Sequence, residues 1–208
     1  MYTLALAALV STALAYPGEV LRVRELTERD NGADGCPHYL PAGQYEKPAY
    51  ITQVSKSQPD KAFGPNYNGI FTPNDISSIF SFDIPAERAD ANCTLEFLFP
   101  KSNDYSYSGG GSFFFTGFNP GSCPGPWTTY NDPPAPGPFP AFPPIHMEPG
   151  NLYTIDVGPC FVAAGTCAAG MTGTNDTNFS FMENDGGCPI GIYTEYSYGL
   201  PPGTPPSS

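Results

Sequence analysis

Proline and glycine interrupt this chain so often that long α-helices are disfavoured. The 208 residues include 26 prolines and 23 glycines. Proline lacks the amide hydrogen that a helix interior needs, and glycine loses more backbone entropy than any other residue when it is held in a helix. Phenylalanine and tyrosine, which favour strands, number 15 and 13. The composition therefore favours an all-β fold.

Short segments in which apolar and polar residues alternate predict the individual strands. In ISSIFSFDIP, residues 76–85, Phe80 and Phe82 share one face and Asp83 lies on the other. CTLEFLFP, residues 93–100, places Glu96 opposite its phenylalanines. We expect each strand to put one face on a core and the other largely in water. Further strands are expected at 49–54, 112–118, 151–157, 178–183 and 188–196, with 127–130 as a short edge strand.

These strands, separated by turn residues, predict an antiparallel two-layer β-sandwich, with jelly-roll and immunoglobulin-like topologies both open. KAFGPNYNGIFTPND, residues 61–75, is expected to form a long loop that buries Phe63, Tyr67 and Phe71. The proline-rich stretch 132–144 is expected to be an extended loop. VLRVRELTERD, residues 20–30, fits a short turn or helix, or a leader that is trimmed.

The first fifteen residues are typical of a secretory signal peptide. Leu4 to Val10 form an apolar run too short to cross a bilayer, and Ala13-Leu14-Ala15 has the small residues that signal peptidase accepts. We expect a polar segment at 16–48, the sandwich domain at 49–196 and a disordered tail at 197–208. The expected location is extracellular or in the cell wall, without membrane insertion.

The cysteines and the net charge indicate which covalent links, metals and partners suit this chain. An exported chain with six cysteines is expected to be stabilised by disulfides, although their spacing does not decide the pairing. The cysteines are Cys36, Cys93, Cys123, Cys160, Cys167 and Cys188. Their spacing does not suit zinc. The formal net charge of −12 disfavours nucleic acid and anionic membranes as partners.

Catalytic motifs are absent from the sequence. His38 and His146 have no recognisable partner motif, and neither a Gly-x-Ser-x-Gly elbow nor a His-Glu-x-x-His zinc site occurs. Asp83 and Glu96 could act as a glycosidase pair if their carboxyl groups lay about 5 to 10 Å apart in a cleft. MENDGG, residues 182–187, fits a calcium site or a plain turn. We expect no catalytic residue, cofactor or metal.

Aromatic side chains in loop-like contexts suggest a surface for stacking against sugars. Tyr105, Tyr107, Trp127 and Tyr130 are the candidates. The expected partners are a wall polysaccharide or an extracellular protein. Asn175 and Asn178 are expected to carry N-linked glycans, whereas Asn92 is disfavoured because it precedes Cys93.

Several motifs resemble a known family. They are VSKSQPDKAFGPNYNGIFTPNDISSIFSFDIP, CTLEFLFPK, TTYND, PGNLYTI and PIGIY, in that order. The chain is similar over about residues 49–193 to fungal secreted proteins with the ubiquitin-binding protein But-two C-terminal domain. The resemblance implies a β-sandwich at the fungal cell surface or wall, with no established catalytic residues. The family label implies, as an alternative function, binding of a ubiquitin-like protein.

Overall fold

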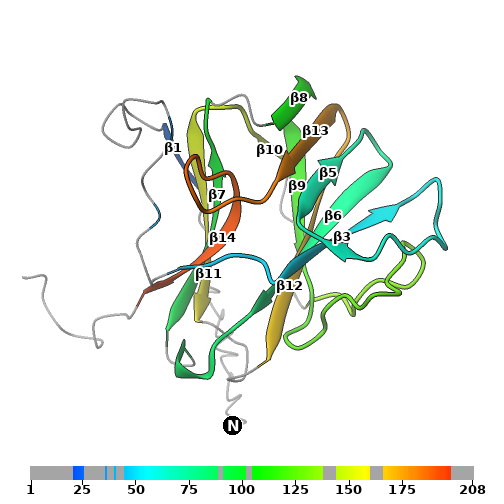
Figure 1. The fold of residues 1–208 in the computed structure, drawn as a ribbon, viewed down its shortest axis with the longest axis horizontal. Coiled ribbons are helices and arrows are strands. Elements are labelled where there is room, and N and C mark those ends of the chain that lie inside the picture. Colours follow the sequence, from blue (N-terminus) through cyan, green and yellow to red (C-terminus); the bar gives the residue numbers. More distant parts are fainter. Residues whose placement is uncertain are drawn as a thin grey trace, which may run out of the picture.

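Three antiparallel β-sheets make up the structure, a computed structural model that describes residues 21–25, 36, 40, 45–88, 91–101, 105–137, 144–159 and 166–197. Sheets of five and six strands face each other, and a three-stranded sheet lies at one end, at the top right of Figure 1. The predicted all-β sandwich is confirmed. Helical structure in the described residues is limited to a 3₁₀ turn, Ala86–Arg88, and no described helix has the length and apolar character needed to span a bilayer.

The five-stranded sheet has the order β1-β11-β7-β14-β2. Its central strand β7 pairs with β11 on one side and β14 on the other, both antiparallel. The strands are β1 (Leu21–Glu25), β2 (Tyr45–Glu46), β7 (Asn92–Phe99), β11 (Asn151–Pro159) and β14 (Gly191–Ser197). Both edge strands therefore come from the N-terminal part of the chain.

The six-stranded sheet has the order β10-β9-β12-β6-β3-β4. Its strands are β3 (Tyr50–Ser55), β4 (Pro65–Asn66), β6 (Ile76–Asp83), β9 (Ser112–Gly117), β10 (Ile145–His146) and β12 (Cys167–Thr174). At Gly173 of β12 a side chain would collide with the ring of Phe114 and the hydroxyl of Ser77. The lack of a side chain at Gly173 thus leaves room for the side chains of the neighbouring strands β6 and β9.

The three-stranded sheet has the order β5-β13-β8. Side-chain hydrogen bonds join it to the six-stranded sheet. Its strands are β5 (Asn68–Phe71), β8 (Tyr105–Gly109) and β13 (Thr177–Met182). The hydroxyl of Ser78 on β6 accepts from the amide of Ile70 and donates to its carbonyl, each at 2.9 Å. Gln53 on β3 also donates to the carbonyl of Asn68. These hydrogen bonds satisfy backbone groups on the edge of β5 without a regular ladder.

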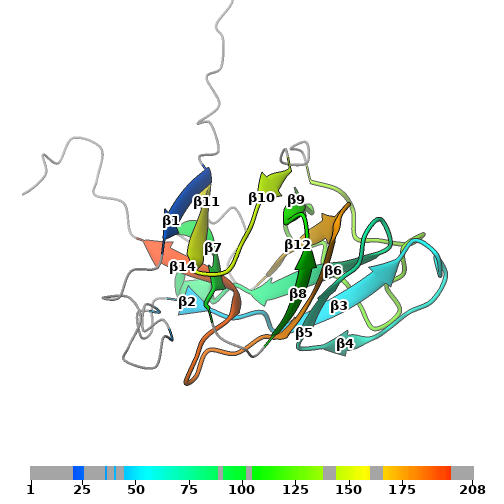
Figure 2. The same ribbon diagram turned by 90° about the horizontal axis from the view of Figure 1, so that it is seen from above.

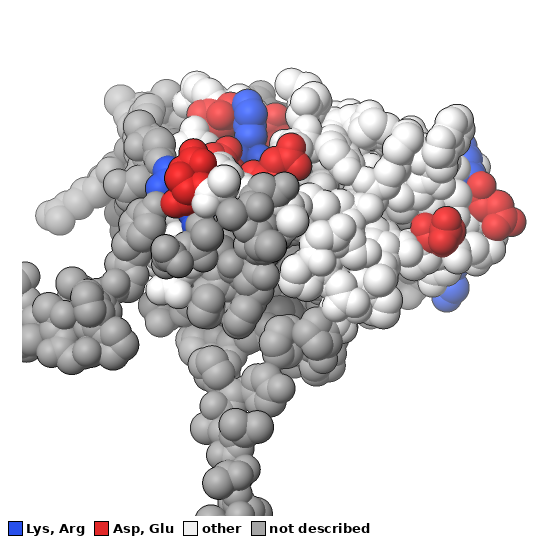
Figure 3. All heavy atoms as spheres, turned by 90° about the horizontal axis from the view of Figure 1, so that it is seen from below, with Lys and Arg blue, Asp and Glu red and all other residues white. Residues whose placement is uncertain are grey.

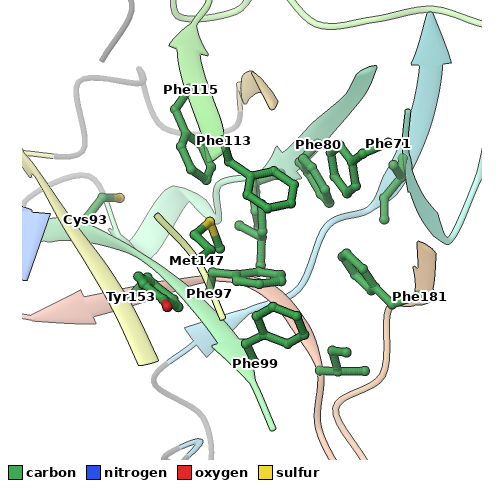
Figure 4. Packing of buried hydrophobic residues seen from close by; sticks show 14 of the residues in the cluster. Phe71, Phe80, Cys93, Phe97, Phe99, Phe113, Phe115, Met147, Tyr153 and Phe181 are labelled. Atoms are coloured by element: carbon green, nitrogen blue, oxygen red, sulfur yellow. The ribbon is translucent and has the colours of Figure 1, made fainter. Parts of the chain in front are cut away.

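Aromatic rings from all three sheets fill the core (Figure 4). Phe80 comes from β6, Phe97 and Phe99 from β7, and Phe179 from β13. Phe71, predicted to be buried, is 2% exposed. Aromatic pairs with centroids 4.5 to 7 Å apart stabilise by about 0.5–1.5 kcal/mol beyond their buried area. The alternation read from 76–85 and 93–100 therefore selects the correct core faces.

The outward faces of the two large sheets are covered, which the sequence did not predict. Ile79 on β6 and Leu98 on β7 point away from the core, yet both are 0% exposed. Residues 118–137 lie over the six-stranded sheet, whereas the N-terminal segment, meaning the described residues between 21 and 46, lies along the five-stranded sheet (Figure 2). The expectation that these faces are largely wet is wrong, because residues 118–137 on one sheet, and Leu40 and Tyr45 on the other, shield them from water.

Several local predictions need correction. Leu21–Glu25 is a strand rather than a turn or helix, because the edge of β11 supplies a pairing partner. Residues 127–130 form no strand, since a turn at Trp127 interrupts them. Tyr67 is 54% exposed rather than buried, and Phe63 is half-buried beneath the amine of Lys61, which lies 4.5 Å from the ring centroid. The predicted 61–75 loop contains β4 and β5.

The described part of the proline-rich loop, residues 132–137 and 144, contains no strand, as predicted. A single bridge from Phe118 to Pro136 fastens it to the end of β9. Residues 138–143, like the proposed signal peptide and the 197–208 tail apart from Ser197, lie outside the described residues.

Replacing Ser78 with alanine tests the link between the sheets. The change leaves the amide and carbonyl of Ile70 without their partner in a partly buried position, so we expect a loss of about 1–3 kcal/mol in the free energy of unfolding. Urea unfolding measures it, with Ser106→Ala on the exposed face of β8 as the control. Equal losses in the two variants would contradict this role for Ser78.

Candidate functional site

Trp127 is the most exposed large apolar side chain that the structure describes, at 82%. It is also the single tryptophan of the chain. A tryptophan with so little buried surface contributes almost nothing to the stability of the fold, because the hydrophobic free energy scales with the apolar area removed from water. Its position therefore needs an explanation other than core packing.

Covalent and backbone links fix both ends of residues 118–137, here named the Trp127 segment. A disulfide joins Cys123 to Cys167 on β12. Backbone amides of the segment donate to its surroundings and to itself: Phe118 to Ala169, Gly121 to Cys167, Asn119 to Ala135 and Gly137 to Gly117, each at 2.9 or 3.0 Å. The segment is thereby held against the outer face of the six-stranded sheet, at the lower right of Figure 1 in yellow-green.

The middle of the Trp127 segment is also anchored. The hydroxyl of Tyr50 donates to the carbonyl of Pro124. Asn131 donates its backbone amide to the carbonyl of Pro59 at 3.0 Å, and its side chain donates to the carboxylate of Asp60 at 2.8 Å. Thr128, only 7% exposed, turns inward and accepts from the amide of Gly125. Trp127 projects outward beside it, on backbone that is held on both sides.

The surface around Trp127 offers an aromatic face and polar groups, and the Trp127 segment has one charged residue, Asp132. Tyr130 is 40% exposed, and residues 118–131 include no Lys, Arg, Asp or Glu. On the face shown in Figure 3, charged residues gather in separate groups with uncharged surface between them. Asp60 and Asn131 add a hydrogen-bonded carboxylate and amide beside the segment. This combination suits a neutral ligand with hydroxyl groups.

The four predicted aromatic residues occupy two separate places. Tyr105 and Tyr107 lie on β8, where both rings pack against Phe99 and Phe179. Burial raises the pKa of both hydroxyls, and that of Tyr107 donates to the carbonyl of Met147 at 2.7 Å. Trp127 and Tyr130 lie in the Trp127 segment, far from β8 in Figures 1 and 2. One platform of four rings is therefore not formed, and ligand binding by these residues stays a prediction.

The proposed carboxylate pair is not assembled. Asp83 ends β6 and is exposed on the outer face of the six-stranded sheet. Glu96 lies on β7 in the opposite sheet, faces outward and is 3% exposed. The chain crosses from one sheet to the other between these strands, so the two carboxyl groups point away from each other. A glycosidase mechanism through this pair is excluded by that geometry.

His146 forms no metal or catalytic cluster with the residues that the structure describes. His146 on β10 is exposed and lies 3.8 Å from the carboxylate of Glu148, which is exposed as well. His38 is outside the described residues. Nowhere among the residues that the structure describes do three His, Cys, Asp or Glu side chains gather closely enough to hold a metal ion.

Residues 182–187, the possible calcium loop, form a turn whose acidic groups have protein partners. The side chain of Asn184 accepts from the amide of Gly186 at 3.0 Å. Asp185 forms an ion pair of 3.1 Å with Lys47. Glu183 is 8% exposed and accepts from the amide of Ile192 at 3.2 Å, and burial raises the pKa of its carboxyl well above the usual value. The turn interpretation is thus the one that fits.

Disulfides involve every described cysteine. Cys36 is bonded to Cys188 and Cys123 to Cys167, with sequence separations of 152 and 44 residues. Cys93 is disulfide-bonded too. Cys160 is outside the described residues. The predicted stabilisation by disulfides is confirmed, and the two described pairs fasten the two segments that cover the sandwich.

The predicted glycan acceptors are accessible. Asn175 is exposed in the turn between β12 and β13, and Asn178 is exposed on β13. Modification at these positions stays a prediction. Asn92 is half-buried at the start of β7, between β11 and β14.

Comparison with known proteins places the fold in a family. The model of the family described as ubiquitin 3 binding protein But2 C-terminal domain matches residues 46–186. The match spans 141 residues (186 − 46 + 1) of the 208 in the chain. The chain belongs to this family. No curated protein matches it.

The matched But2 domain includes all of the six-stranded and three-stranded sheets but only part of the five-stranded one. Within residues 46–186 that sheet has β7, β11 and the last residue of β2. β1 and β14 lie outside the match. The Trp127 segment lies inside it.

Glu183 should make stability depend on pH. Its carboxyl has a higher pKa in the folded protein than in the unfolded chain, so stability is greatest below the unfolded pKa and falls as the pH rises toward the folded pKa. We expect Glu183→Gln, which cannot ionise, to be more stable than the unchanged protein at pH 8, with the difference shrinking toward pH 4. Urea unfolding at both pH values measures this, with exposed Glu148→Gln as control. A difference that does not vary with pH would contradict it.

Proposed function

We propose that this chain is a secreted, non-catalytic protein that binds a neutral polysaccharide of the cell wall through Trp127 and Tyr130. The observation that carries the proposal is the 82% exposure of Trp127 on a segment that is anchored at its ends and its middle. An anchored segment loses little conformational entropy on binding, which favours affinity.

The chemistry of the surface supports a sugar rather than a charged ligand. Sugar rings present apolar C–H faces that can lie against an aromatic ring, and hydroxyl groups that need hydrogen-bonding partners. Trp127 and Tyr130 would supply the rings, whereas Asp60 and Asn131 would supply polar groups. The Trp127 segment has no Lys or Arg, and its one charged residue is the acidic Asp132, so it gives no attraction for a polyanion.

Export is supported by cysteine chemistry and by the first residues of the chain. Every cysteine that the structure describes is disulfide-bonded, a state that persists in oxidising compartments and is rare in the cytosol. The apolar run and Ala13-Leu14-Ala15 provide an export signal. The cell wall would be the polysaccharide-rich surface that such an exported protein meets.

Protein binding is the second candidate, and the family match favours it. The family description names ubiquitin 3 binding. For this chain, that activity would require a ubiquitin-like partner in the same compartment. Tyr67, just before β5, is 54% exposed, and its carbonyl accepts from the amide of Glu183 at the end of β13. Its ring is an exposed contact separate from Trp127.

A Trp127→Ala variant distinguishes polysaccharide binding from protein binding. We expect Trp127→Ala to weaken cosedimentation with insoluble wall polysaccharide by about tenfold or more, the range seen when a central tryptophan contact is removed. Tyr67→Ala, which removes another exposed aromatic ring, should bind normally. Since Trp127 is the single tryptophan, its fluorescence should also shift to shorter wavelength when soluble oligosaccharide covers it.

Two results would contradict the polysaccharide proposal. One is unchanged cosedimentation of Trp127→Ala; the other is a failure of the unchanged protein to bind any wall polysaccharide while ubiquitin-coated beads retain it. If Tyr67→Ala then abolished retention on the beads, protein binding would take the place of sugar binding.

Cleavage of the signal peptide gives an independent test of export. We expect the protein in culture medium to begin at Tyr16, as measured by mass spectrometry of its N-terminal peptide. Its cysteines should resist alkylation unless a reductant is added. Full-length protein confined to the cytosol, with reactive thiols, would rule out a role at the wall.

A further inference from the structure

The outer edge of β11 is covered by a strand from a distant part of the chain. β1 pairs antiparallel with β11, from Leu21 opposite Ile155 to Glu25 opposite Asn151. The other edge of β11 pairs with β7 inside the sheet. Without β1, an edge of five residues would present unpaired amide and carbonyl groups, which form a template for another strand.

The described residues from Cys36 to Glu46 have contacts of their own that do not involve β1. Cys36 is bonded to Cys188, and β2 pairs with β14 at the opposite edge of the sheet. Leu40 and Tyr45 pack against a small apolar cluster on the outer face, formed by Leu98, Leu152 and Tyr193. Detachment of β1 would therefore leave this cover and the disulfide in place.

The connection between β1 and the disulfide is long enough for β1 to reach another molecule. Ten residues, 26 to 35, separate Glu25 from Cys36 in the sequence. A chain of that length spans up to about 33–36 Å when fully extended. That reach exceeds the spacing of about 5 Å between neighbouring strands several times over.

We propose that the outer edge of β11 is a strand-accepting site, and that β1 of a second copy of this chain can occupy it in place of the molecule's own β1. Each copy carries both the strand and the edge, so an exchanged pair has the same backbone hydrogen bonds as two separate molecules. Because the second copy has the same β1 sequence, its strand fits the edge of β11 as well as the molecule's own strand does.

Concentration decides between the two arrangements. A connection of ten residues gives the molecule's own strand an effective concentration on the order of millimolar. In dilute solution β1 stays on its own sheet. Where copies are crowded, as on a surface that they all bind, strands of neighbouring copies compete, and the exchange links the copies into dimers or longer assemblies.

Proline scanning in β1 can open the site. Successive residues of a strand direct their amides to opposite sides, so of Arg22 and Val23 only one donates toward β11. Proline at that position removes a ladder hydrogen bond, whereas proline at the other faces solvent and is tolerated on an edge. Arg22→Pro and Val23→Pro are thus an opening variant and its matched control.

The probe is a fluorescent synthetic peptide of residues 20–26, VLRVREL, added to the full-length chain without its signal peptide. We expect saturable binding to one of the two proline variants, and binding more than about tenfold weaker to the other and to the unchanged protein. A peptide with proline at the effective position should not bind. Hydrogen exchange should show β11 amides deprotected in the opening variant and protected again by the peptide.

Dimer formation tests whether a second copy serves as the partner. After refolding at high concentration, we expect the unchanged protein to yield dimers in size-exclusion chromatography with light scattering. Excess peptide added during refolding should suppress them, and the opening variant should form none. The proposal is overturned if both proline variants keep native circular dichroism yet bind no peptide, if the proline-containing peptide binds equally well, or if dimers are absent or insensitive to the peptide.

Discussion

The packing of Phe179 against other aromatic rings joins the three sheets into one body. Its ring lies within 6.1 Å of seven others, and the nearest centroid is that of Phe99 at 4.8 Å. These rings come from β5, β7, β8, β9 and β13. Because the space between the sheets is filled in this way, residues that recognise a ligand have to lie on the outside. The core therefore sets where function can be located as well as how stable the fold is.

Two segments cover the outer faces of the large sheets. The Trp127 segment covers the outer face of the six-stranded sheet, and the N-terminal segment covers that of the five-stranded sheet. Each is fastened by a disulfide whose other cysteine lies on or near a sheet. A disulfide stabilises mainly by restricting the unfolded chain, so it suits segments with few regular hydrogen bonds of their own. Outward side chains such as Ile79 and Leu98 are thereby buried.

Sequence patterns predicted the strands at 76–83 and 92–99, where large apolar residues alternate with polar ones. β12 was missed because its alanines and glycines carry no strand preference. At Gly173 a side chain has no room, because Phe114 lies too close. β1 was missed because its pairing depends on a strand 126 positions later (151 − 25). The Tyr-Ser alternation of 105–108 could have revealed β8, and with it the inward packing of both tyrosines. The exposure of Trp127 depends on a disulfide and hydrogen bonds to residues far away in the sequence. The sequence therefore suggested Trp127 as a candidate but did not reveal how its segment is held.

The two proposed surfaces lie on opposite sides of the sandwich, so one does not obstruct the other. A polysaccharide at Trp127 would contact the outside of the six-stranded sheet, whereas strand exchange takes place at the far edge of the five-stranded sheet. Binding to a polymer would also raise the local concentration of copies, which is the condition that favours exchange between molecules. Linked copies would then hold the polymer at several points. Each additional contact would slow release without any change in the affinity of a single Trp127 site.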